Sequence, residues 1–112
     1  MARFLFPEDD EGIADMCGFG VVWAGHVLDP AATGTEGRDL ARSLEYDGIV
    51  TDGEMPGLDG PGLLAEIRPL VRDRVPCALK SAGIYSDWPE LGFEWFLAKP
   101  FGFRDLAELC TE

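Results

Sequence analysis

The sequence predicts an α/β domain with a central parallel sheet. Short apolar runs alternate along the chain with segments of helical periodicity, the pattern of strands that alternate with helices. The runs are apolar on both faces and are bounded by turn residues, which is typical of buried parallel strands. Four runs fit this description, at residues 4–6, 48–51, 75–79 and 95–98. A weaker fifth run, 27–28, is followed by Asp29 and Pro30, so it is expected at an edge of the sheet.

Helices are expected between these strands. The clearest begins behind Gly60 and Pro61, because proline suits the first position of a helix, and its apolar residues recur at helical spacing over 63–71. A second helix is expected around residues 40–44 with Thr35 as its cap, and a terminal one around 103–110. The first helix, over residues 11–24, contains three glycines and is poorly supported by propensity alone.

Length and charge restrict the possible functions. The 112 residues correspond to one domain, since domains contain about 150 residues. A net charge of −12 argues against binding to a phosphate backbone or to an anionic membrane surface. The start lacks the apolar run of a signal peptide, so a cytoplasmic protein is expected. Three cysteines, Cys17, Cys77 and Cys110, lie far apart in apolar surroundings and are expected to be reduced thiols.

Polar side chains follow four of the predicted strands. Glu8, Asp9 and Asp10 come after the first strand, Asp52 ends the third, Ser81 follows the fourth and Lys99 ends the fifth. The carboxyl ends of parallel strands form the ligand-binding edge of such a sheet. Converging carboxylates repel one another and favour a hard divalent cation such as Mg²⁺, which also shares phosphate ligands. The set therefore has the groups that phosphoryl transfer requires: a nucleophilic carboxylate, a metal site, a hydroxyl group and a cation.

Residues 46–60 resemble the phosphoacceptor segment of a response-regulator receiver domain, with Asp52, Met55, Pro56, Gly57, Asp59 and Gly60 in the pattern D-x-x-M-P-G-x-D-G. The resemblance extends over almost the whole chain, through residues 4–9, 24–25, 75–82 and 96–101. It implies a CheY-like, flavodoxin-like fold with a doubly wound five-stranded parallel sheet in the order 2-1-3-4-5. It also implies that residues 1–112 form a single receiver domain of a two-component system, without an effector domain.

The resemblance implies a role for each site residue. Asp52 would accept a phosphoryl group from the phosphohistidine of a histidine kinase or phosphotransfer protein. Mg²⁺ would be held by Asp9, Asp52 and the backbone carbonyl of Glu54, with Glu8 near it through water. Lys99 would pair with the phosphoryl oxygens, and Ser81 and Phe96 would form the switch. Such a domain catalyses only its own phosphorylation and dephosphorylation and is not otherwise an enzyme.

Several residues depart from the family pattern. Glu8 replaces the usual aspartate, Pro7 removes a backbone donor beside the metal site, and both predict weak metal binding. These departures leave open a degenerate receiver that acts as a phosphorylation-independent interaction module. A third interpretation, a phosphatase that uses Asp52 and Glu54, is disfavoured because such enzymes usually carry a cap domain that this length excludes.

The segment over residues 83–96 departs further. Ser81 and Lys99 are separated by only 18 residues, and Pro89 falls where the fourth helix would lie, so a single turn or a loop is expected there. The last helix is also expected to be short. Ile84, Tyr85, Trp88, Phe93 and Trp95 predict a partly exposed, mobile apolar patch that serves as the output surface. The protein is expected to be a monomer or a weak homodimer, and the sequence does not specify its downstream partner.

Overall fold

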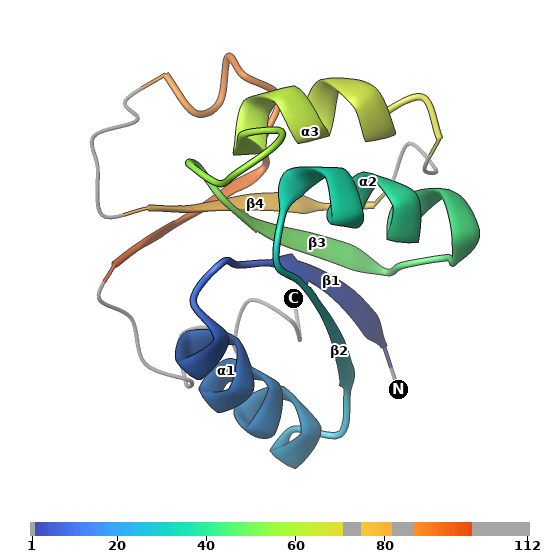
Figure 1. Ribbon diagram of the computed structural model, residues 1–112, viewed down its shortest axis with the longest axis vertical. Helices are drawn as coiled ribbons and strands as arrows, with labels where there is room; N and C mark the ends of the chain where they lie inside the picture. The colour runs from blue at the N-terminus through green and yellow to red at the C-terminus, as the bar shows by residue number, and fades with distance from the viewer. Residues whose placement is uncertain (1, 71–74, 82–86, 100–112) are drawn as a thin grey trace.

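A five-stranded parallel sheet forms the centre of the structure (Figure 1). This computed structural model describes residues 2–70, 75–81 and 87–99. The strand order is β2-β1-β3-β4-β5, as the sequence predicted. The strands are β1 (Arg3–Pro7), β2 (Val27–Ala31), β3 (Gly48–Asp52), β4 (Cys77–Ser81) and β5 (Trp95–Ala98).

Helices cover both faces of the sheet. Helix α1 (Glu11–Trp23) lies on one face, and α2 (Gly34–Ser43) and α3 (Gly60–Ile67) lie together on the other (Figure 1). The Asp10 side chain caps α1 by accepting a hydrogen bond from the backbone N–H of Ile13. Asp59 caps α3 in the same way. The expected terminal helix lies outside the described residues.

Three details of the sequence prediction are wrong. The cap of α2 is Thr33, not Thr35, because the helix begins one turn earlier than its apolar residues indicate. Strand β4 runs from Cys77 to Ser81 rather than over 75–79, so it includes Lys80. Helix α3 ends at Ile67, and Leu70 beyond it is exposed.

The apolar core lies in two layers, one on each side of the sheet. Strand residues alternate between the faces, so Leu5, Ile49 and Leu79 pack towards α2 and α3. Phe4, Phe6, Val50 and Ala78 pack towards α1 in the second layer. Cys17 and Cys77 are buried free thiols, as expected, and burial raises the pKa of Cys77 to about 12. Cys110 lies outside the described residues.

Residues 87–92 form consecutive turns instead of a helix. Backbone N–H groups of Leu91, Gly92 and Phe93 donate to carbonyls three to five residues earlier. The absence of a helix over these residues confirms the expectation drawn from Pro89. Of the residues expected in the partly exposed apolar patch, Trp95 is exposed, whereas Phe93 is buried and Trp88 packs against the core and stacks on Phe96. Ile84 and Tyr85 lie outside the described residues.

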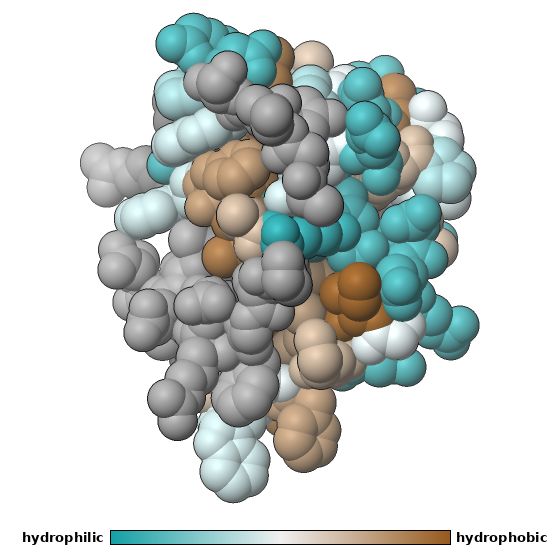
Figure 2. Space-filling model, turned by 90° about the vertical axis from the view of Figure 1, so that its left-hand side faces the viewer, coloured by the Kyte–Doolittle hydropathy of each residue, from teal (hydrophilic) through white to brown (hydrophobic). Residues whose placement is uncertain are grey.

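Helix α1 exposes several large apolar side chains. Met16, Phe19, Val22 and Trp23 are between 50% and 82% exposed. Apolar colour accordingly reaches the lower part of the surface in Figure 2, whereas hydrophilic side chains predominate on its right-hand side. Within the described part of the chain, no helix has the length and apolar character to cross a membrane.

The start of α3 packs directly on the end of β3 at Gly60. A Cβ atom at this position would overlap the backbone carbonyl of Asp52 and lie 3.1 Å from the Cα atom of Gly53. Only a residue without a side chain permits this approach, and the approach fixes the backbone that carries Asp52.

We expect Gly60→Ala to destabilise the protein by roughly 1–3 kcal/mol or more, since backbone atoms on both sides must move. The matched control is Gly18→Ala in α1, where a Cβ would meet only the Leu28 side chain at 3.9 Å. That change is expected to stabilise by about 0.5–1 kcal/mol through helix propensity. Urea denaturation measures the free energy of unfolding of both variants, and an equal change in the two would contradict close packing at Gly60.

Candidate functional site

Four charged side chains meet where the strands end, on the face of the sheet that α1 covers. Each lies two residues beyond a core residue of that face, and the alternation of a strand gives both residues the same direction. The pairs are Phe6 and Glu8, Val50 and Asp52, Ala78 and Lys80, and Leu97 and Lys99. The sequence therefore brings Glu8, Asp52 and Lys99 together as predicted, and it adds Lys80.

Asp52 is the centre of this cluster. Its Oδ1 lies 2.6 Å from the Nζ atom of Lys99 and 3.1 Å from the Nζ atom of Lys80. The Asp52 side chain is 4% exposed, whereas that of Lys99 is 24% exposed. Both lysines therefore contact the same carboxylate oxygen of Asp52, Lys80 from the protein interior and Lys99 from the pocket.

Lys80 is the residue that the sequence analysis missed. Its ammonium group reaches three acceptors, the Pro7 carbonyl at 3.0 Å, Glu8 Oε1 at 3.0 Å and Asp52 Oδ1 at 3.1 Å. Three acceptors saturate the three N–H donors of a lysine, and the group also lies 4.3 Å from the centre of the Phe6 ring. The side chain is completely buried. The available signal was a charged residue directly after the apolar run 75–79. The chain contains two lysines, and both contact Asp52.

Glu8 is turned into this charged cluster. Its Oε1 accepts from Lys80 and lies 3.4 Å from Lys99, and its Oε2 accepts from the Asp10 backbone N–H. Burial by itself would raise the pKa of Glu8, but the hydrogen bond to Asp52 and the charge of Lys80 outweigh it and lower the pKa to about 2. Glu8 is thus an ionised carboxylate bound to protein donors.

The other members of the cluster are shifted by the same forces. Burial raises the pKa of Asp52, and the hydrogen bond to Glu8 adds to this increase. Burial lowers the pKa of Lys80 against the opposing pull of the two carboxylates. Burial also acts to lower the pKa of Lys99, but its contacts with Asp52 prevail and raise it. Lys99 therefore stays protonated beside the pocket.

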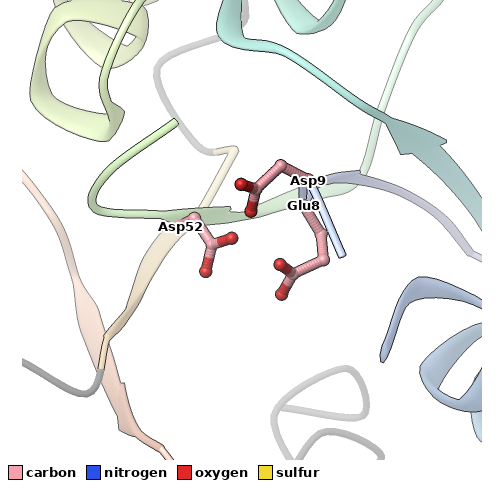
Figure 3. Close-up of side chains that lie close together, drawn as sticks. All are labelled: Glu8, Asp9 and Asp52. Atoms are coloured by element: carbon pink, nitrogen blue, oxygen red, sulfur yellow. The ribbon is translucent and has the colours of Figure 1, made fainter. Parts of the chain in front are cut away.

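Carboxylate oxygens of Glu8, Asp9 and Asp52 lie within 4.8 Å of one another. Figure 3 shows the side chains of Asp9 and Asp52 turned towards each other, with the side chain of Glu8, which directly follows β1, beside them. Beside them is an open pocket of about 240 Å³, lined by Asp9, Asp52, Gly53, Glu54, Lys80, Ser81 and Lys99. These hard oxygen donors fit a magnesium ion, and the exposed Asp9 and the pocket-lining Asp52 and Glu54 lie where an ion can enter.

Of the two residues expected to form the switch, Ser81 lies beside the pocket and Phe96 lies on the other face of the sheet. Ser81 ends β4, lines the pocket and accepts a backbone hydrogen bond from Lys99. Phe96 is partly buried on the opposite face of the sheet, against the layer of α2 and α3, and stacks on Trp88 with ring centres 6.1 Å apart.

Comparisons with known proteins agree with this fold. The chain is 30% identical over 107 residues to the probable transcriptional regulatory protein SilR of Salmonella typhimurium, covering 93% of this chain and 47% of SilR. It superposes on the receiver domain of the hybrid histidine kinase CckA with a TM-score of 0.83 and 30% identity, covering 97% and 95% of the two chains. The receiver domain of the sensor histidine kinase PA1611 from Pseudomonas aeruginosa PAO1, solved with magnesium in its active-site cleft, gives a TM-score of 0.84 at 26% identity over 96% and 93%. No protein-family model matches the chain.

A doubly wound sheet with acidic residues and a lysine at its carboxyl edge defines the class of receiver domains. The chain belongs to the response-regulator receiver-domain family of two-component signalling proteins. It spans about half the length of the curated transcriptional regulators that it matches.

Proposed function

We propose that the chain is a phosphoryl-accepting switch whose acceptor is Asp52. The observation that carries this proposal is the geometry of Asp52, whose carboxylate is at the pocket edge while two lysines hold its Oδ1. The phosphoryl donor is the phosphohistidine of a histidine kinase or phosphotransfer protein. The named receiver domains of CckA and PA1611, which come from kinases of this class, support the assignment.

The residues divide the chemistry among them. A carboxylate oxygen of Asp52 attacks phosphorus, the P–N bond of the phosphohistidine breaks, and the imidazole leaves with the bonding electron pair. Because Oδ1 already accepts from both lysines, the second oxygen is the better nucleophile. Lys99 is charged and adjacent, so it stabilises negative charge on the transferring phosphoryl oxygens.

Asp9, Asp52 and the backbone carbonyl of Glu54 are the proposed magnesium ligands. When bound, Mg²⁺ neutralises charge on the phosphoryl oxygens. Glu8 was expected to reach the metal through water, and its two oxygens instead accept from Lys80 and Asp10. We therefore assign Glu8 to holding Lys80, with its role at the metal secondary.

The signal is proposed to pass through Ser81 and Phe96. Ser81 lines the pocket and can move onto a phosphoryl group on Asp52. Phe96 belongs to the neighbouring strand, and β4 and β5 pair through Leu79 and Phe96. Trp88, stacked on Phe96, connects this change to the turns over residues 87–92, which we propose as the part of the output surface within the described residues.

Incubation with acetyl phosphate followed by intact mass measurement tests the proposal. With Mg²⁺ we expect the mass of one phosphoryl group to be added, in a product that loses it slowly, and with EDTA we expect no addition. Metal dependence follows because the transferring group meets a site rich in carboxylates. Absence of labelling with both acetyl phosphate and a phosphorylated kinase would contradict the proposal.

A second candidate is a receiver that signals through contacts alone. The buried Lys80 favours it, because its ammonium group already contacts two carboxylates of the acidic site. In that case the unphosphorylated protein binds its partner, and Asp52 replacements leave the affinity unchanged. If the protein binds its partner only when it is phosphorylated, the result supports the phosphoryl-accepting switch instead.

A further inference from the structure

The ammonium group of Lys80 sits between the two buried carboxylates of the site. The side chains of Glu8 and Lys80 are 1% and 0% exposed, and that of Asp52 is 4% exposed. All three lie in strands or directly after one, and β3 and β4 pair Asp52 with Lys80 in register. The strand pairing therefore fixes the position of these three side chains, and a side-chain rotation alone does not bring the Lys80 ammonium group into water.

We propose that Lys80 is a resident cation of the phosphorylation site, which holds Glu8 and Asp52 together before any metal binds and weakens the binding of Mg²⁺. The inference rests on the proposed function for the presence of a metal at Asp9 and Asp52. It assigns a positioning role to a residue that forms no part of the predicted ligand set.

Charge balance gives the first reason. Within the described part of the chain, the cluster contains three carboxylates, Glu8, Asp9 and Asp52, and two ammonium groups, Lys80 and Lys99. Two of the three negative charges are therefore already compensated. A divalent cation gains correspondingly less from entering, since the attraction it would supply is largely satisfied.

Burial gives the second reason. A metal ion that coordinates Asp52 shares that carboxylate with Lys80, whose Nζ lies 3.1 Å from Oδ1. Water and salt screen charges poorly at a site that excludes solvent, so the two cations repel each other strongly. Lys99 lies partly in solvent and can turn away, whereas Lys80 is enclosed with all three donors engaged.

The same contacts stabilise the metal-free protein. Unpaired carboxylates at this distance repel, and proteins commonly use the metal to relieve the repulsion. Here Lys80 provides that relief from within. Mg²⁺ should therefore raise the melting temperature of the natural protein only slightly, and much more once the lysine charge is removed.

The test is the affinity of the unphosphorylated protein for Mg²⁺, measured by isothermal titration calorimetry with MgCl₂. Lys80→Met keeps most of the volume and removes the charge, and it is expected to bind Mg²⁺ at least about tenfold more tightly than the natural protein. Arg38→Met is the matched control, since it removes one positive charge from an ion pair with Glu66 on the surface. It is expected to change the affinity by less than about twofold, because solvent screens the lost charge.

A second pair of variants covers the case in which Lys80→Met does not fold without metal. The double variant Glu8→Gln/Lys80→Met removes both charges of the buried Glu8–Lys80 ion pair, so that neither is left without its partner. It is compared with Glu8→Gln alone. We expect the double variant to bind Mg²⁺ more tightly than Glu8→Gln. The proposal is overturned if neither Lys80 replacement increases the affinity over its parent. Because this measurement involves no phosphorylation, failure of Asp52 to accept a phosphoryl group is a separate result that overturns the proposed function.

Discussion

The Asp52→Asn variant is expected to gain no phosphoryl group from acetyl phosphate and Mg²⁺ under conditions that label the natural protein. Asparagine keeps the size of the side chain and one oxygen acceptor for Lys80 and Lys99, but its amide cannot form the acyl phosphate. The variant should still fold, since burial already disfavours the charged form of Asp52. Intact mass and a melting curve measure the two properties.

The matched control for this loss is Glu54→Gln. The Glu54 side chain is exposed, and only its backbone carbonyl is assigned to the metal. This variant should be labelled as fully as the natural protein. Labelling of Asp52→Asn to the same extent would show that another residue is the acceptor. Loss of labelling in Glu54→Gln would show that its carboxylate, rather than its carbonyl, serves the metal.

Replacing Lys80 by alanine is expected to lower the free energy of unfolding by about 3–5 kcal/mol at neutral pH, the usual cost of breaking a buried ion pair from one side. The change leaves the carboxylates of Glu8 and Asp52 buried without their shared partner. It also removes a fully buried side chain from beside Phe6. A loss of this size is a large share of the 5–15 kcal/mol typical of a domain, and urea denaturation measures it.

Lys99→Ala serves as the comparison, because Lys99 binds the same oxygen of Asp52 at the shorter distance of 2.6 Å. If distance controlled the energy, Lys99 would matter more. Since the Lys99 side chain is 24% exposed and Asp52 keeps Lys80 as a buried partner, we expect a loss of only about 1 kcal/mol. A larger loss for Lys99→Ala than for Lys80→Ala would contradict the assignment of Lys80 as the structural cation.

Much of the fold was predictable because its signals are local. The apolar runs at 48–51 and 95–98 locate β3 and β5, and Pro61 at the start of the helical pattern locates α3. Pro89 correctly excludes a helix over residues 87–92. Boundaries were less reliable where polar residues belong to an element, as Thr35 and Glu36 belong to the first turn of α2.

The site was predictable where a charged residue at the end of an apolar run also falls at a site position of the family pattern, whereas Lys80 follows the run 75–79 but has no place in that pattern. Glu8, Asp52 and Lys99 stand out for this reason, and the parallel sheet brings their carboxyl ends to one edge. The family pattern supplied the remaining roles, including that of the Glu54 carbonyl. These roles depend on residue order, which a sequence records directly.

Lys80 shows what residue order does not record. By itself, a lysine near the end of an apolar run indicates the end of a strand, since burying an unpaired ammonium group is costly. Only the sheet register, which places Lys80 beside Asp52, and the path of β1, which brings Pro7 and Glu8 to the same point, supply its three acceptors. The sequence by itself thus determined the acidic edge and the position of the proposed phosphoacceptor. The tertiary structure decided that a buried cation belongs there, because its compensating partners lie 28 and 72 residues away and meet it only after the strands pair.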